Sequence, residues 1–186
     1  TDRSRGLGDV YKRQVLYQMN SVNESSEKEV VISCEQAVHN SLSEPFTYTL
    51  SEEKNAVCQL ADRVETYLYE PGAALLKAGP YRLLSQRYGV KKLHPNSHLY
   101  TSSVQVDFPG RCFQVTGISG FGKKEVKELL GGLEKANLTV RNFPASVADL
   151  RKKLKLKEGG DVYLFATTLQ NGEKVLIKCL KPALLS

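Results

Sequence analysis

The sequence predicts a mixed α+β chain that consists of two small domains in succession. Strand-like runs rich in β-branched and aromatic residues alternate with helix-like stretches along the chain. The segment Asp107-Phe-Pro-Gly110 has turn chemistry and marks the boundary. After it the pattern restarts and reads β-α-β-α-β-β over residues 111–180.

Three strand-like segments precede the helical stretch of the first domain. Residues 29–34 and 64–69 are rich in β-branched and aromatic side chains, and residues 46–50 alternate between apolar and polar. A polar linker over 20–28 separates the first of these strands from Val15-Leu-Tyr17, a short apolar run that is a candidate strand remnant.

A helix is predicted over residues 72–88, where Pro71 suits the first turn and Gly89 suits the end. Its apolar residues recur at helical spacing. Gly79-Pro80 should kink this helix or split it into two short ones, because proline removes a backbone donor and clashes with the preceding turn. Residues 93–102 are expected to form a turn that leads into a short strand.

The second domain has clear signals for helix ends and turns. Ser146-Val-Ala-Asp149 has the spacing of a capping box, Gly159-Gly160 is a stop signal, and Asn171-Gly172 between two apolar runs indicates a hairpin. The expected strands are 111–118, 138–142, 161–168 and 174–180, and the expected helices are 123–136 and 146–156.

The composition is that of a globular protein. The 186 residues are 41% hydrophobic and 25% charged, which excludes wholesale disorder, a collagen and a disulfide scaffold. No apolar run approaches the roughly 20 residues that span a bilayer, so no membrane partner is expected. The four cysteines are widely separated and form no Cys-x-x-Cys pair, so a reduced, cytoplasmic protein is the default expectation.

Charge is distributed unevenly along the chain. Residues 1–75 carry 7 basic and 12 acidic side chains, a net charge of −5, whereas residues 76–186 carry 19 basic and 8 acidic ones, a net charge of +11. Segregation on this scale points to a polyanionic partner of the C-terminal part and does not say which polyanion it is.

The segment Gly117-Ile-Ser-Gly-Phe-Gly-Lys-Lys124 resembles part of a phosphate-binding loop between a strand and a helix. Lys124 stands where a Ser or Thr would hold magnesium, which argues against a nucleoside triphosphatase. The alternatives are a flexible turn, or a helix start at which Lys123, Lys124 and backbone amides hold a nucleic-acid phosphate without hydrolysing it.

Neither a metal site nor a catalytic site is predicted. His94 and His98 are four residues apart, but Pro95 and Asn96 between them disfavour the helix that would make this a metal-binding spacing. No serine lies in a nucleophile elbow, and each cysteine lies in or beside an apolar run, as a buried structural thiol does.

Basic residues of the second domain are the candidates for RNA contact, although a solvated helix face would also explain the run 151–157. The candidate RNA-binding residues are Lys123, Lys124, Arg141, Arg151, Lys152 and Lys153. Tyr163 and Phe165 are candidates for base stacking only if they face outward, and burial in the strand is the alternative.

The first fourteen residues have no helical or strand periodicity. The string Arg5-Gly-Leu-Gly-Asp-Val-Tyr-Lys-Arg-Gln14 resembles translated sequencing-adapter sequence, so residues 1–14 are expected to be non-native and to form no part of the fold. We expect the native chain to continue further upstream.

Several long motifs resemble one bacterial family. They are Tyr67-Leu-Tyr-Glu-Pro-Gly-Ala-Ala-Leu-Leu-Lys-Ala-Gly79, Lys92-Leu-His-Pro-Asn-Ser-His-Leu-Tyr-Thr-Ser102, Asp107-Phe-Pro-Gly-Arg-Cys-Phe113, Arg141-Asn-Phe-Pro144 and Glu158-Gly-Gly-Asp-Val-Tyr-Leu-Phe-Ala-Thr-Thr168. Over about Val15 to Lys181 the chain resembles the C-terminal half of class I S-adenosylmethionine-dependent methyltransferases of the Bacteroidetes type. The resemblance implies an N-terminally truncated ferredoxin-like domain over 15–106 and a THUMP-like domain over 107–186.

The resemblance also implies a division of labour. The methyltransferase domain, with its S-adenosylmethionine, would lie upstream, so this chain is expected to hold no cofactor and to be inactive alone. RNA, either tRNA or rRNA, is the partner that THUMP-type domains suggest, and the upstream domain would be a second partner. The family-motif residues that are candidates for contact with that domain are Tyr69, Glu70, Lys77, His94, Asn96, His98 and Tyr100.

Two functions from different classes therefore remain open. In the first, the chain is the substrate-recognition half of an RNA methyltransferase and binds structured RNA through its basic face. In the second, it is a structural or dimerisation module of the methyltransferase that does not touch RNA. Charge reversal at Lys123 and Lys124 separates them, because only the first predicts weaker RNA binding with the fold intact.

Overall fold

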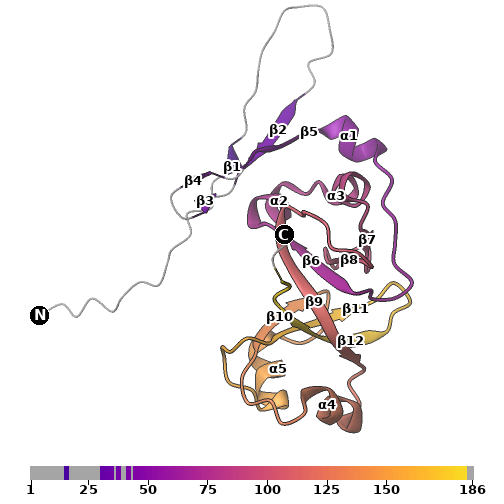
Figure 1. Ribbon diagram of the computed structural model, residues 1–186. Helices are drawn as coiled ribbons and strands as arrows, with labels where there is room; N and C mark the ends of the chain where they lie inside the picture. Colours follow the sequence, from indigo (N-terminus) through magenta and orange to yellow (C-terminus); the bar gives the residue numbers. More distant parts are fainter. Residues whose placement is uncertain (1–14, 17–29, 36, 39–40, 43, 184–186) are drawn as a thin grey trace, which may run out of the picture.

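The computed structural model describes residues 15–16, 30–35, 37–38, 41–42 and 44–183, so the expectations for residues 1–14 and 20–28 lie outside the described residues. Within that part, seven strands form one sheet, in which only β10 and β11 are parallel neighbours (Figure 1). In spatial order these strands are β10 (Asn137–Arg141), β11 (Tyr163–Thr168), β12 (Lys174–Leu180), β9 (Gly110–Ser119), β6 (Tyr67–Pro71), β8 (Tyr100–Ser102) and β7 (Lys91–Lys92).

The N-terminal part contributes a three-stranded sheet of β1 (Val15–Leu16), β2 (Val31–Cys34) and β5 (Phe46–Thr49), and a two-stranded one of β3 (Ala37–Val38) and β4 (Ser41–Leu42). The helices are α1 (Leu50–Asn55), α2 (Ala73–Ala78), α3 (Tyr81–Tyr88), α4 (Lys123–Leu130) and α5 (Val147–Leu154). The N-terminal strands and α1 lie beyond α2 and α3 at one end of the molecule, and α4 and α5 lie at the other end (Figure 1). The α+β class and the order β9-α4-β10-α5-β11-β12 confirm the prediction for the second half.

Strand β9 joins the two halves of the chain into one sheet. Its first residues pair with β6, from Gly110 opposite Pro71 to Gln114 opposite Tyr67. From Gln114 onward its other edge pairs with β12, where Gln114 lies opposite Leu180. The sheet is therefore continuous across the turn at residues 107–110.

Local signals explain where the helices begin and end. The predicted helix over 72–88 is split into α2 and α3, because Gly79 ends α2 in the left-handed region and Pro80 follows it. The prediction that the next helix extends to residue 136 was wrong. Helix α4 ends at Leu130, because Gly131 adopts a φ of 56° and donates its N–H to the Lys127 carbonyl.

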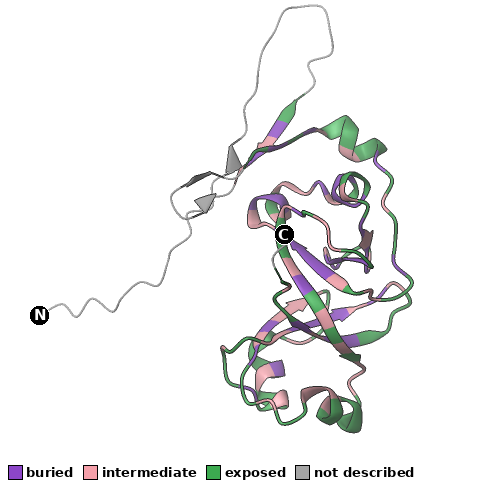
Figure 2. Ribbon diagram, in the orientation of Figure 1, coloured by how far each residue is buried: buried purple, intermediate pink, exposed green. Residues whose placement is uncertain are grey.

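Three apolar clusters pack against the sheet, two on one face and one on the other. On one face, Tyr69 and Tyr100 pack under α2 and α3, and at the other end of this face Leu164 and Leu176 pack under α4 and α5. The opposite face carries a cluster contributed by both halves of the chain: Leu68, Leu93, Leu99, Phe113, Phe165, Leu169, Val175, Ile177 and Cys179, with Ala61 from the preceding loop. Figure 2 shows buried residues concentrated in the strands and mostly exposed ones in α1 and α4.

The sheet is strongly curled around this shared cluster. Strands β10 and β6 are separated by β11, β12 and β9, which would place them about 19 Å apart in a flat sheet. Nevertheless the Arg141 side chain on β10 contacts the Glu70 carboxylate on β6. The curl thus brings motifs from both halves of the chain to one place.

Candidate functional site

A buried carboxylate organises the junction between the two halves. The Glu70 side chain is only 4% exposed. Its Oε1 accepts hydrogen bonds from Nε and Nη2 of Arg141 at 3.1 and 2.7 Å. Its Oε2 accepts from Nε of Arg111 at 2.9 Å and also from Nη2 of that residue. One carboxylate therefore fixes the Nε–Nη2 edges of two guanidinium groups that are themselves half-exposed.

The turn of residues 93–99 lies beside this centre. Leu93 and Leu99 are fully buried and anchor the turn, and the Leu93 N–H donates to the Leu99 carbonyl at 2.9 Å. Between them, His94 Nδ1 accepts from the Asn96 N–H at 2.9 Å and lies 3.0 Å from Nδ2 of Asn142, just after β10. The turn is thus tied to the second half of the chain.

His98 is a neutral, stacked side chain. Its ring stacks on Tyr81 with centroids 3.7 Å apart and an interplanar angle of 16°. Burial, assisted by the positive charges of Lys92 and Arg141, lowers the pKa of His98 to about 4. The imidazole is therefore uncharged near neutral pH, and its buried Nδ1 has no hydrogen-bond partner within the described part of the chain.

Lys92 is a buried cation that lies over the ring of Tyr81. Its Nζ donates to the Pro95 carbonyl and lies 5.0 Å from the centroid of Tyr81. Burial lowers the pKa of this ammonium below its ordinary value. Arg111 and Arg141 share the one carboxylate of Glu70, so the two guanidinium groups at the junction outnumber the carboxylate that binds them.

The family-motif candidates have different environments. Tyr69 and Tyr100 are fully buried core residues, and their hydroxyls donate to the Val104 and Tyr81 carbonyls, respectively. Lys77 and Asn96 are exposed. Only Glu70, His94 and His98 of the set therefore converge at the junction, and contact of any of them with an upstream domain stays a prediction.

Metal binding finds no support among the residues that the structure describes. Over these ranges, no group of three or more His, Cys, Asp or Glu side chains converges as a cation site. His94 and His98 are in a turn and not on a helix, and His98 faces the Tyr81 ring.

The outer surface of α4 and α5 carries most of the predicted RNA-binding residues. Lys123, Lys124, Lys152 and Lys153 are exposed, and none of them forms an ion pair with any described carboxylate. Lys153 Nζ lies 5.9 Å from the centroid of Phe121, two residues before α4. The end of α5 and the start of α4 are therefore neighbours, so these lysines share one region of the surface.

The two arginines among these candidates are engaged elsewhere. Arg141 is held by Glu70, and Arg151 Nη1 donates to the Ala136 carbonyl at 3.1 Å. Both tie elements together, so lysines make up the freely available positive charge of α4 and α5.

The N-terminus of α4 is capped by a carboxylate of the protein itself, that of Glu125. The Glu125 carboxylate lies 3.4 Å from the Gly122 N–H, and a Cβ on Gly120 would lie only 2.6 Å from the same carboxylate. The side chain therefore occupies the place at the helix N-terminus where a phosphate would bind. This disfavours the phosphate-loop interpretation of residues 117–124 and leaves Lys123 and Lys124 as surface charges.

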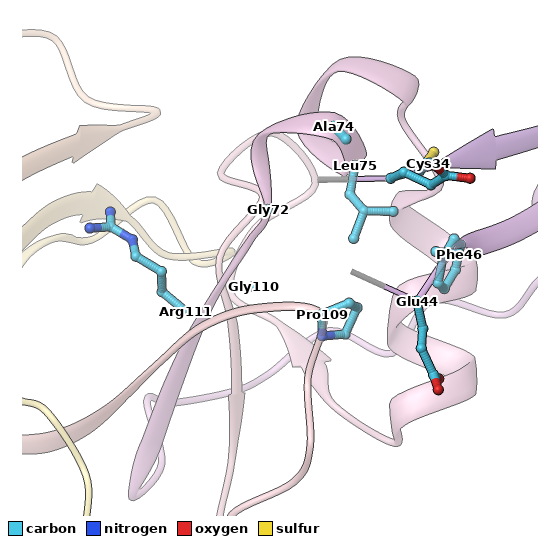
Figure 3. A pocket seen from close by; sticks show the side chains of 10 residues that line it. Cys34, Glu44, Phe46, Gly72, Ala74, Leu75, Pro109, Gly110 and Arg111 are labelled. Atoms are coloured by element: carbon cyan, nitrogen blue, oxygen red, sulfur yellow. The ribbon is translucent and has the colours of Figure 1, made fainter. Parts of the chain in front are cut away.

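A small hollow lies where the N-terminal strands meet α2 and the start of β9 (Figure 3). It measures about 260 Å³, and its inner wall is formed by Leu75, Phe46 and Pro109. The Cys34 thiol at its edge is buried, which raises its pKa. Figure 3 shows that the Arg111 side chain points away from the hollow, so this space lacks the cation of the neighbouring junction.

Comparison with known families assigns both halves of the sheet. Residues 67–109 match the model of a ferredoxin-like domain, and residues 110–181 match the model of a THUMP domain-like family. The chain combines a ferredoxin-like and a THUMP-like domain. None of the curated proteins matches it.

One solved structure shares this arrangement. It is the crystal structure of a putative methyltransferase from Porphyromonas gingivalis W83, with 37% sequence identity and a TM-score of 0.80. The match covers 88% of this chain and 41% of that protein, whose C-terminal part it corresponds to. The chain thus spans about two fifths of the length of this relative.

The junction described above lies between the ferredoxin-like and THUMP-like domains. Glu70 belongs to the former, and Arg111 and Arg141 belong to the latter. Sequence reasoning did not single out Arg111, Tyr81 or Asn142. Arg111 and Asn142 each lie within one of the family motifs, and this membership was the sequence signal that could have identified them. The residues next to them in the sequence do not indicate that the motifs meet in the fold.

None of the described helices is long and apolar enough to cross a bilayer.

Proposed function

We propose that the chain is the substrate-recognition part of an RNA methyltransferase and that its THUMP-like domain binds RNA. The observation that carries this proposal is the group of exposed lysines on α4 and α5 that lack carboxylate partners within the described chain. Cations without protein counterions are the residues that neutralise RNA phosphates and release the condensed counterions. The similarity to a putative methyltransferase supplies the reaction class.

In this proposal methyl transfer belongs to a part of the protein upstream of the ferredoxin-like domain. That part would bind S-adenosylmethionine, and the chain described here would deliver the RNA to it. The RNA would be a structured one, tRNA or rRNA, which implies a cytoplasmic location.

Charge reversal tests RNA binding directly. The full chain is titrated against a labelled tRNA transcript at ~50 mM salt, where phosphate contacts are strongest. The variant Lys123→Glu/Lys124→Glu should weaken binding by about tenfold or more, because it replaces two attractive contacts with two repulsive ones. A matched control, Lys54→Glu/Lys77→Glu, changes the net charge by the same amount on exposed residues of α1 and α2 and should bind almost like the wild type.

Two results would contradict the proposal. Absence of any tRNA or rRNA-hairpin binding at ~50 mM salt would exclude RNA recognition by this chain. Equal weakening in both double variants would show that only the net charge matters. Either result, with circular dichroism showing an intact fold, favours the structural role for these domains.

A further inference from the structure

A second cavity lies on the free edge of β9. Strand β12 ends at Leu180, opposite Gln114, so residues 110–113 of β9 pair with β6 on one edge and with no described strand on the other. A groove of about 770 Å³ lies along this edge, between the loop of residues 105–108 and the segment that follows β12. Its size is within the range of small-molecule and nucleotide sites.

The backbone of Cys112 faces this groove. The Val115 N–H donates to the Thr66 carbonyl, and the Gly72 N–H donates to the Pro109 carbonyl, so odd-numbered residues of this stretch pair toward β6. In an antiparallel ladder, the backbone N–H and C=O groups of successive residues point to opposite edges of the strand. The N–H and C=O of Cys112 therefore point away from β6, toward the edge that borders the groove. This residue therefore offers one donor and one acceptor side by side.

The floor of the groove is aromatic. The rings of Phe113 and Tyr163 lie 4.9 Å apart between centroids, inclined at 50°. Phe113 is buried, whereas Tyr163 at the start of β11 is half-buried and lines the groove. An exposed part of a tyrosine ring beside paired backbone donor and acceptor groups is suited to stacking a nucleobase.

Two cations, Arg111 and Lys181, line the groove beside this floor, together with one exposed carboxylate, Asp107. The Arg111 side chain is 53% exposed, and its Nε–Nη2 edge is held by Glu70, which leaves Nη1 without a hydrogen bond to any described residue. Because Glu70 is buried and also bound to Arg141, the guanidinium is oriented before any ligand arrives. Lys181, just after β12, lines the groove and is exposed with no ion pair in the described structure.

We propose that this groove binds one unpaired nucleotide of an RNA strand, with its base stacked on Tyr163 and its phosphate between Arg111 Nη1 and Lys181. The inference rests on the proposed RNA-binding function. It adds a site on the face of the sheet opposite to the one that α4 and α5 cover with their lysines. Phosphate oxygens fit the free guanidinium edge, and the base edge can pair with the Cys112 backbone.

The test uses the full chain and two probes: a fluorescein-labelled single-stranded oligoribonucleotide and a blunt RNA duplex. Tyr163→Ala and Lys181→Glu should each weaken single-strand binding about tenfold, because each removes one stacking or phosphate contact. Tyr163→Phe keeps the ring, and Lys174→Glu reverses an exposed lysine at the other end of β12, so both should bind like the wild type. Binding of the duplex should be unchanged in all four variants.

The outcomes separate this site from the proposed function. If the wild type binds RNA but Tyr163→Ala and Lys181→Glu bind the single strand normally, the nucleotide site is wrong and RNA recognition by the lysines stands. If neither RNA binds, the proposed function fails, and titration with AMP alone then decides the groove. Shifts of Tyr163 ring resonances that Lys181→Glu abolishes would support a nucleotide site, and their absence would overturn it. Lys181→Glu also covers the case in which Tyr163→Ala fails to fold, because Lys181 is outside the core.

Discussion

Arg141 donates two hydrogen bonds, at 3.1 and 2.7 Å, to the Oε1 atom of Glu70, a residue 71 positions earlier in the chain. The contact closes the curled sheet by linking β10 at its edge to β6. It also joins the THUMP-like domain to the ferredoxin-like domain through a carboxylate that is almost completely buried. This side-chain contact therefore adds to the continuous β9 strand and the shared apolar cluster in fixing the orientation of the two domains.

Loss of the Glu70 charge should destabilise the chain more than loss of either arginine. Glu70→Gln leaves two neighbouring guanidinium groups without a counterion and should lower the free energy of unfolding by about 2–4 kcal/mol. Arg141→Met should cost about 1–2 kcal/mol, because Glu70 keeps Arg111 and the methionine retains apolar packing. Urea denaturation measures both, and a smaller loss for Glu70→Gln than for Arg141→Met would contradict this ordering.

Gly110 is required by the close approach of β9 to β6. A Cβ there would lie 2.1 Å from the Glu70 carbonyl oxygen and 2.8 Å from the Gly72 nitrogen, both backbone atoms that cannot move alone. Gly110→Ala should therefore prevent native pairing and leave little soluble, folded protein. Gly117→Ala is the matched control on the same strand, because its Cβ would meet the movable end of the Leu129 side chain at 2.7 Å. Soluble yield and thermal unfolding compare the two variants, and equal yields with equal melting temperatures would refute the steric argument.

Stability should fall on mild acidification because of His98. In the unfolded chain this histidine takes up a proton near pH 6.5, whereas burial in the folded chain lowers its pKa to about 4. Between these values the unfolded state binds more protons, so the free energy of unfolding decreases as the pH falls, by at most about 1.4 kcal/mol per pH unit. The loss is complete near pH 4.

Urea titrations at pH 6.5 and pH 5 measure this effect. His98→Asn should flatten the dependence, since asparagine does not titrate and tolerates the φ of 52° at this position. His94→Gln changes the other histidine of the turn and should leave the dependence in place. An unchanged slope in His98→Asn would assign the effect to other groups.

The buried thiols should resist alkylation in the folded protein. Burial raises the pKa of Cys179 to about 12 and also raises the pKa of Cys34, so little thiolate forms at neutral pH. Iodoacetamide at pH 7.5, followed by peptide mass spectrometry, should modify both residues slowly in buffer and quickly in urea. Rapid modification of Cys179 in buffer would show that the cluster under the sheet opens readily.

Local chemistry in the sequence determined most elements of this protein. Gly79-Pro80 predicted the split between α2 and α3, and Asn171-Gly172 predicted the hairpin between β11 and β12, because turn and helix-end geometry depends on neighbouring residues. The motifs at 67–79, 92–102, 107–113, 141–144 and 158–168 also indicated the ferredoxin-like and THUMP-like combination that the family matches show.

Only the tertiary structure decided what these elements do together. RNA contact by Arg141 stays a prediction, but only the structure shows that Glu70 holds this side chain, because the curl of the sheet brings β10 to β6. Tyr163 was ambiguous between core and surface, and the end of β12 at Leu180 leaves part of its ring beside an open groove. Strand pairing, curl and the lengths of neighbouring strands are properties of residues far apart in the chain, so no local pattern could have specified these contacts.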